Sequence, residues 1–217
     1  LKLVLKFGGT SLASPKDIQD VAKTITSFSK DNEIVVVCSA VDGVTDDLIL
    51  ISKMIEQTKK NDVNEALNKI IKKHEEFADQ TIKNSAVKKQ LLEKLSSDVS
   101  ELQELVRGLT LLKEVSVRSM DYLISFGERL SDDLVSYALQ DLKKKSTALN
   151  GKEVGIVTDS NFGSSRPLMD TTRIRISKTL GSLLSGKVIP VVGGFAGADQ
   201  HGNITTFGRG GSDYTAT

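Results

Sequence analysis

The sequence has no tryptophan, three prolines and a single cysteine, Cys38, among its 217 residues. One cysteine cannot form an internal disulfide, so we expect the chain to work in a reducing compartment, the cytoplasm. No stretch approaches the roughly 20 apolar residues that span a bilayer. The opening apolar run, broken by Lys2 and Lys6, is too short for a signal peptide and resembles a strand. We therefore expect neither a membrane partner nor secretion.

Neither sign of charge dominates, because 29 Lys and Arg residues face 28 Asp and Glu residues, giving a formal net charge of +1. Nucleic acids and anionic membrane surfaces attract a basic excess, so the balance supports neither as a partner. The length and the 39% hydrophobic content suffice for one substantial domain with a core. His74 has no second His or Cys at ligand spacing, and no structural metal site is predicted.

The first eleven residues, LKLVLKFGGTS, join an apolar run to two glycines. The run Leu1 to Phe7 predicts a buried strand. Gly8 and Gly9 remove the side chains that would keep a ligand from the main chain, and they permit positive φ angles. A helix start follows at the Ser14-Pro15 pair, so the glycines lie between a strand and a helix.

A glycine turn in that position is typical of anion sites, in which backbone N–H groups converge on a ligand. The hydroxyls of Thr10 and Ser11 and the ammonium group of Lys6 would add donors and a positive charge. The alternative is a tight turn with a solvated lysine, and two glycines alone do not decide between them.

The residues that follow predict a parallel β-α-β unit, with a helix from 14 to about 30 and a β-branched strand over 34–38. Ligands of parallel sheets usually bind beyond the carboxyl ends of the strands. The segment SAVDGVT leaves the second strand at that edge and carries Ser39 and Thr45. From the residues alone, these two hydroxyls fit a local turn and a helix cap as well as ligand contacts.

Residues 46–110 have few glycines, no proline and long helical periodicity rich in Lys and Glu. We predict helices over 46–60, over 63–84 and from 86 onward, forming a helical hairpin inserted on the α/β core. The charge-rich outer face is expected to be solvated, with a subunit contact as the alternative. His74 lies in the apolar stripe and is expected to be packed or half-exposed.

The remaining sequence predicts shorter elements. Residues 115–145 favour a helix that Gly127 interrupts, either as a break or as a point of close approach. Strands are predicted over 146–149, 154–157, 188–192 and 204–207. A helix over 170–186 should point Ile174, Leu180, Leu183 and Leu184 inward and end at Gly186. The turn 199–203 should leave His201 exposed, and the segment GRGGSD, 208–213, should lead into a helix.

Five segments occur in the same order as in aspartate kinases, members of the amino-acid kinase superfamily: KFGGTS, SAVDGVT, SFGE, GGF and GRGGSD. This resemblance covers effectively the whole chain. It implies an α/β fold, a three-layer αβα sandwich with a mainly parallel central sheet. The chain would be the N-terminal portion of one catalytic domain, residues 1–217. A nucleotide-binding half and ACT regulatory domains would lie beyond it, so we expect the fragment alone to be inactive.

The resemblance also implies roles for individual residues. Lys6 would contact the nucleotide phosphates, and Asp213 would orient it. Glu128 would meet the α-ammonium group of L-aspartate, and Arg209 would hold its α-carboxylate. The remaining substrate-binding residues would be Ser39, Thr45, Phe195 and Ser212. The remaining phosphate-binding residues would be Gly8, Gly9, Thr10, Ser11, Gly210 and Gly211.

The implied reaction is phosphoryl transfer from ATP, with Mg²⁺, to the β-carboxylate of L-aspartate, the first step of lysine, threonine and methionine biosynthesis. The full-length protein is expected to be a homo-oligomer. Two alternatives stay open within the fold: a kinase of glutamate, acetylglutamate or carbamate, and an amino-acid-binding module without catalysis. A helical interaction protein built on residues 46–110 is a third, although it leaves the glycine-rich segments unexplained.

Overall fold

The computed structural model of this chain describes residues 1–208 and 211–216 and contains a four-stranded parallel sheet. Its strands lie in the order β1-β2-β4-β3. Their bounds are β1 (Lys2–Phe7), β2 (Glu33–Cys38), β3 (Ser146–Leu149) and β4 (Ile189–Gly193). The register sets Phe7 opposite Cys38 and Cys38 opposite Gly193, so three strands end at one edge. The predicted parallel sheet is confirmed.

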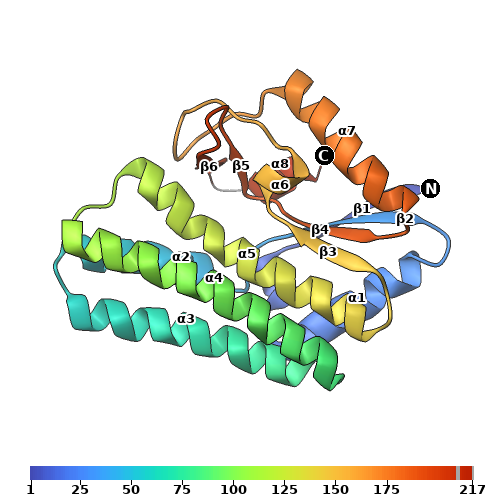
Figure 1. Ribbon diagram of the computed structural model, residues 1–217, viewed down its shortest axis with the longest axis horizontal. Helices are drawn as coiled ribbons and strands as arrows, with labels where there is room; N and C mark the ends of the chain where they lie inside the picture. The colour runs from blue at the N-terminus through green and yellow to red at the C-terminus, as the bar shows by residue number, and fades with distance from the viewer. Residues whose placement is uncertain (209–210, 217) are drawn as a thin grey trace.

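Helices cover both faces of this sheet, as Figure 1 shows. α7 (Met169–Ser185) lies on one face, and α1 (Pro15–Phe28) and α5 (Val117–Asp141) lie on the other. The predicted three-layer αβα arrangement is thereby confirmed. α1 begins at the predicted residue because the Ser14 hydroxyl accepts a hydrogen bond from the Asp17 N–H at 3.2 Å.

The segment predicted as a helical hairpin forms α2 (Val44–Glu56), α3 (Lys60–Thr81) and α4 (Ser85–Leu112). Their apolar residues belong to the same core as those of the sheet and α1, so these helices are part of the domain and not a separate module. His74 is buried in this core, at 1% exposure, with its Nδ1 2.8 Å from the Ile70 carbonyl oxygen. None of the helices in the described residues has the length and apolar content needed to cross a membrane.

The predicted strand over 154–157 is wrong. Asn150 and Glu153 form a capping box, each side chain binding the other residue's N–H, and this begins the short helix α6 (Gly151–Val154). Val157 makes only an isolated parallel bridge to Ala198. The other short elements are η1 (Gly9–Leu12), β5 (Ala196–Ala198), β6 (Ile204–Thr206) and α8 (Gly211–Thr215). β5 and β6 pair antiparallel across the predicted turn, where His201 is exposed.

Strand β1 was expected to be buried, but it lies at the edge of the sheet and is half-buried. Leu3, Leu5 and Phe7 pack on the core, whereas Val4 on the opposite side is 51% exposed. A run of apolar residues does not reveal whether a strand has a neighbour on both edges. Lys2 and Lys6 therefore lie on the face of the strand that the core does not cover.

α7 also differs from its prediction. Ile174 is 72% exposed, and Thr172 is the helix's buried residue. Ile176 and Leu180 provide the apolar contacts, which pack against a small cluster around Val154 and Ile156. The helix ends at Gly186 as predicted, although Gly186 has a negative φ and the left-handed residue is Lys187.

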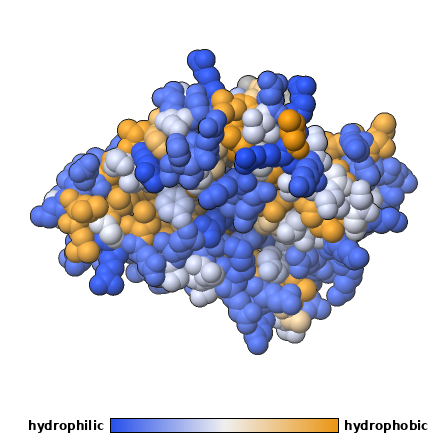
Figure 2. Space-filling view, turned by 45° about the horizontal axis from the view of Figure 1, so that its top comes forward, coloured by the Kyte–Doolittle hydropathy of each residue, from blue (hydrophilic) through white to orange (hydrophobic). Residues whose placement is uncertain are grey.

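The surface of the helical layer is mostly polar. Figure 2 shows hydrophilic side chains over much of one face, with apolar atoms at its left end and in further groups at the top and right. The turn between α4 and α5 lies at the left end in Figure 1, and the helix ends that flank it carry the exposed side chains of Leu111, Leu112 and Val117. The expected solvated outer face thus applies along the helices but not at this turn.

A buried cluster of charges joins α4 to α5. Asp98, on α4, has no exposed surface and accepts hydrogen bonds from Arg129 Nη2 at 2.5 Å and Lys94 Nζ at 2.5 Å. Arg129 also donates to Glu101 at 2.6 Å, and Tyr122 donates to the same carboxylate. Buried charges are tolerated when they are paired and hydrogen-bonded in this way. The cluster fixes the rotation of α5 about its axis.

We predict that Asp98→Ala lowers the free energy of unfolding by roughly 3 kcal/mol, because Lys94 and Arg129, both half-buried, each lose their shortest ion pair, at 2.5 Å. Asp79→Ala is the matched control, since Asp79 pairs with Lys88 at 2.7 Å but is 73% exposed. Its loss should stay under about 1 kcal/mol. Urea unfolding measures both, and equal losses would contradict the role of the buried cluster.

Candidate active site

The predicted site residues meet at the edge where β1, β2 and β4 end. Lys6 is the penultimate residue of β1, and its Nζ lies 2.6 Å from Asp213 Oδ1 on α8. Ser39 follows β2 directly, and its N–H donates to the Phe7 carbonyl oxygen at 3.0 Å. These residues therefore lie at the carboxyl ends of parallel strands, the edge where ligands of such sheets usually bind.

The Gly8-Gly9 turn has a different cause from the one predicted. Neither glycine has a positive φ; Gly8 has φ −80° and ψ 171°. A Cβ on Gly9 would lie 3.2 Å from the Ala40 carbonyl oxygen, so the close approach of two loops favours a glycine there. η1 follows at once, with Thr10 and Ser11 exposed on it. The turn thus presents main chain and two hydroxyls beside Lys6.

Glu128 is the most constrained residue of the site. It lies on α5 with 5% exposure. Its Oε2 accepts from the Phe195 N–H at 2.7 Å, and its Oε1 accepts from the Ser212 hydroxyl at 2.9 Å. The Ser39 hydroxyl donates to Ser212 Oγ at 3.2 Å. Four predicted substrate-binding residues are thereby joined in one hydrogen-bonded chain.

Burial raises the pKa of Glu128 to about 8, because removal from water penalises the charged carboxylate. The Phe195 N–H, the Ser212 hydroxyl and the charge of Lys6 offset part of this effect. Each carboxylate oxygen keeps accepting capacity beyond its one hydrogen bond. An arriving cation would therefore find an acceptor already oriented for it.

Glycines allow the other elements of the site to pack close to Glu128. A Cβ on Gly194 would lie 2.8 Å from Ser212 Cα, so α8 packs directly on the end of β4. The Thr215 hydroxyl fastens this contact by donating to the Gly194 carbonyl oxygen at 2.6 Å. A Cβ on Gly211 would lie 2.8 Å from Phe207 Cβ. The GGF and GRGGSD segments thus carry glycine where two backbones meet.

Gly127 does not interrupt α5, which is continuous from Val117 to Asp141. The expected break is wrong, and the expected close approach is confirmed. A Cβ on Gly127 would lie 3.0 Å from Ala40 Cβ and 3.6 Å from Thr45 Oγ1. Thr45, in the first turn of α2, therefore lies against α5 one residue from Glu128. Arg209 and Gly210, the other two predicted site residues, fall outside the described residues.

Sequence reasoning missed two buried residues that follow Glu128. Ser131 donates to the Ser39 carbonyl oxygen at 2.7 Å and so supports the loop after β2. Asp132 is 2% exposed, and a Cβ on Gly193 would lie 2.8 Å from its Oδ2. The available signal was the pair of adjacent acids, Asp132 and Asp133, in a helical stretch that is otherwise mostly apolar. Acids are rarely buried unless they have a partner or a role.

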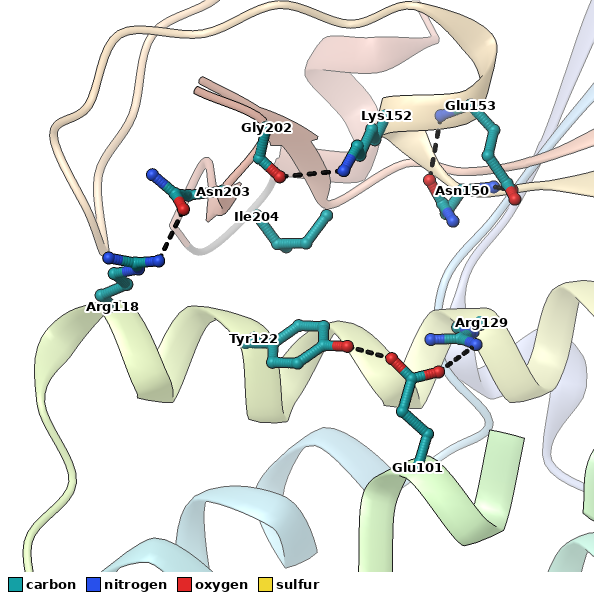
Figure 3. A pocket seen from close by; sticks show the side chains of 10 residues that line it. All are labelled: Glu101, Arg118, Tyr122, Arg129, Asn150, Lys152, Glu153, Gly202, Asn203 and Ile204. Carbon is teal, nitrogen blue, oxygen red and sulfur yellow. Dashed lines mark hydrogen bonds and ion pairs between the residues drawn. The ribbon is translucent and has the colours of Figure 1, made fainter. Parts of the chain in front are cut away.

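A second concavity lies on the other side of α5, as Figure 3 shows. It has a volume of about 600 Å³ and opens between α5 and the β5–β6 hairpin. Arg118 and Lys152 reach the hairpin turn, donating to Asn203 Oδ1 at 2.6 Å and to the Gly202 carbonyl oxygen at 3.0 Å. Glu101 is already bound by Tyr122 and Arg129. Among residues 1–208 and 211–216, none of the predicted site residues lines this groove.

The parallel sheet, the two glycine turns and the buried acceptor define the class of protein. The model of the amino acid kinase family matches residues 2–217, and the chain belongs to that family. It is 36% identical over 220 residues to aspartokinase 3, chloroplastic, of Arabidopsis thaliana, covering 100% of this chain and 38% of that protein. It is 31% identical to the aspartokinase of Geobacillus stearothermophilus, covering 99% of this chain and 38% of that one.

Solved structures agree with these likenesses. The structure of Escherichia coli aspartokinase III in complex with aspartate and ADP matches with a TM-score of 0.87 and 25% identity. The match covers 99% of this chain and 45% of that one. The same enzyme in complex with lysine and aspartate also gives a TM-score of 0.87. The chain thus spans about 38% of the length of the curated relatives it matches.

We predict that Glu128 makes the free energy of unfolding fall as pH rises from about 4.5 to about 8. Its pKa is raised in the folded chain, so over this range the folded chain binds a proton that the unfolded chain has lost. Relative to Glu128→Gln, the wild type should lose on the order of 4 kcal/mol over this range. Urea unfolding across pH, in buffers free of K⁺ and Na⁺, measures it. Glu75→Gln, at an exposed glutamate, should leave the slope unchanged.

Proposed function

We propose that this chain is the aspartate-binding part of an aspartate kinase. The enzyme would transfer the γ-phosphoryl group of ATP to the β-carboxylate of L-aspartate, giving 4-phospho-L-aspartate, the first step of lysine, threonine and methionine biosynthesis. One observation carries the proposal: the buried acceptor chain Glu128–Ser212–Ser39 lies beside the Lys6–Asp213 ion pair. An amino-acid site and a phosphate site would then share one edge of the sheet. The aspartokinase names of the relatives support it.

The amino-acid half of the site has the chemistry that an α-amino acid needs. Glu128 would accept the α-ammonium group, which supplies a charge-assisted hydrogen bond and disfavours dicarboxylates that lack the amine. Ser39 and Thr45 would orient the rest of aspartate, and Phe195 and Ser212 would line the pocket. Arg209, by the family resemblance, would bind the α-carboxylate with its guanidinium fork.

The proposed phosphate half of the site would meet the main demand of the reaction, which is to neutralise charge. The side-chain carboxylate of aspartate has a pKa of about 3.9, so the nucleophile is ionised near neutral pH and needs no general base. It must instead approach a polyphosphate against repulsion. Lys6, held by Asp213, and the turns at Gly8-Gly9 and Gly210-Gly211 would offset that charge and align the reactants.

We assign Mg²⁺ to the nucleotide and not to a site made by this chain. Among the described ion pairs, Asp213 is the one acid beside Lys6, and its side chain is 72% exposed. A single exposed carboxylate gives no reason to place a metal site there. When bound with ATP, Mg²⁺ neutralises phosphate charge. The single cysteine supports a reducing compartment such as the cytoplasm, although some relatives carry chloroplastic names. Homo-oligomer formation by the full-length protein remains part of the proposal.

A non-catalytic amino-acid-binding module is the second candidate, because the buried acceptor Glu128 and its partners Phe195 and Ser212 lie within the described residues. A glutamate or acetylglutamate kinase would share the fold. Aspartate-dependent ADP release, with glutamate as the control substrate, separates the three. Release with aspartate alone supports the aspartate kinase, and release with glutamate overturns its specificity. Saturable aspartate binding without ADP release supports the binding module.

In the whole protein, we predict that Lys6→Ala lowers kcat at least about 100-fold, because a preorganised charge at the transferring phosphate is lost. The dissociation constant for aspartate should change less than about threefold, since Lys6 faces the phosphates. Lys2→Ala is the matched control: Lys2 lies on the same strand, 75% exposed and 3.9 Å from Glu33. Near-normal turnover of Lys6→Ala would remove Lys6 from the mechanism.

Arg209→Ala should act on the other half of the site. Losing a bidentate charged contact to the α-carboxylate should raise the KM for aspartate at least about tenfold and leave the KM for ATP within about threefold. Steady-state kinetics with each substrate varied in turn measures the split. An unchanged KM for aspartate would refute the assignment.

A further inference from the structure

A small cavity lies behind Glu128, on the side that faces α6 and β5. Its volume is about 30 Å³, enough for one water or one small ion. Oxygen-bearing groups on its wall include Ser125, Glu128, Asp132 and Asn150, and the backbone at Gly193 and Ala196 closes it. It shares Tyr122, Arg129, Asn150 and Ile204 with the groove of Figure 3, which gives a route from solvent.

Asp132 lines this cavity with a carboxylate that has no partner. It is 2% exposed, and neither Oδ1 nor Oδ2 has a hydrogen bond within the described structure. The charges that act on it come from Glu128, Asp133 and Glu153, all of the same sign. A buried carboxylate in that situation requires a compensating positive charge or a proton.

The neighbouring cations are engaged elsewhere. Lys94 binds Asp98 at 2.5 Å and lies 3.5 Å from Asp133. Arg129 binds Asp98 and Glu101. Lys6, whose charge reaches Glu128, is paired with Asp213. The positive charge that Asp132 needs is therefore not supplied by a described ion pair.

Asp132 and Glu128 converge over Gly193. A Cβ placed on this glycine would lie 2.8 Å from Asp132 Oδ2 and 3.2 Å from Glu128 Oε2. Glycine at this position leaves open the space where the two carboxylates face the same point. Any larger residue would fill it.

We propose that this cavity binds an alkali-metal cation, K⁺ or Na⁺, between the carboxylates of Glu128 and Asp132. Hard cations prefer oxygen ligands, which the cavity wall supplies. A divalent ion is disfavoured, because no group of three or more metal-ligating side chains occurs in the part of the chain described. The space also matches one small ion and not a hydrated one.

The cation would balance part of the negative charge of Glu128 and Asp132, and this affects substrate binding. The effect on the substrate rests on the proposed function. Two carboxylates and one monovalent cation leave one net negative charge, which one substrate ammonium group neutralises. Without the cation, the pair must hold an additional proton, and a protonated Glu128 lacks the negative charge that an ammonium group pairs with. Cation binding should therefore favour aspartate binding.

The direct test is crystallographic. Crystals of this chain grown in rubidium chloride should show an anomalous peak in the cavity, close to oxygens of both Glu128 and Asp132. The peak should vanish in Asp132→Asn and in Gly193→Ala, whose methyl group occupies the meeting point while both acids remain. Asp62→Asn, at an exposed acid of α3, should retain it. Wild-type crystals with only a water, or nothing, in the cavity would overturn the proposal, whether or not the chain binds aspartate.

The second measurement is calorimetric binding of aspartate at constant ionic strength and pH 7. Replacing K⁺ and Na⁺ by N-methylglucamine should weaken wild-type binding about tenfold, the effect of one modest charge interaction. Asp132→Asn should lose this salt dependence, and Asp62→Asn should keep it. A rubidium peak without aspartate binding in any salt would support the cation site and refute the proposed function. A peak with salt-independent binding would refute the link between the two.

Discussion

The fold at the candidate site depends on the burial of one carboxylate, that of Glu128. A carboxylate removed from water must find donors, and here they come from the backbone after β4 and from α8. The hydroxyl of Ser212 also meets the loop after β2 through Ser39. Four elements are thereby set around one side chain. The glycines at 193 and 194 follow from this arrangement, since the elements could not approach if either carried a side chain.

α5 fixes the position of this carboxylate because the helix packs against other elements on two sides. Toward the sheet it buries Phe126, Leu130 and Leu134 in the main core. Toward α4, Arg129 is bound to Asp98 and Glu101. Adjacent residues of a helix point about 100° apart, so fixing Arg129 on the α4 side also fixes the direction of Glu128. The long helices that resemble an insertion in the sequence thus set the orientation of the site.

The sequence predicted the parallel sheet, the layers and most helices, because apolar periodicity and capping residues are local signals. It misjudged what depends on neighbours in space. β1 has the composition of a buried strand but lies at an edge, and Val154 belongs to a helix that the Asn150–Glu153 capping box begins. Glu128, Ser39 and Ser212 came from family resemblance, and their mutual hydrogen bonds from the fold. Asp132 was not predicted, because burial of an acid depends on packing that no short pattern encodes.

The residues of the site are far apart in the sequence, so the ribosome makes them at different times. Ser39 and Ser212, which share a hydrogen bond, are separated by 173 residues. At roughly 5–20 residues per second, a ribosome needs on the order of 10–40 s to make the second after the first. During that interval β1, β2 and the long helices can pack, since they precede residue 142. Glu128 then lacks both described donors until Phe195 is made, and lacks Ser212 until synthesis reaches α8, so a chain still being made presents an incomplete amino-acid site.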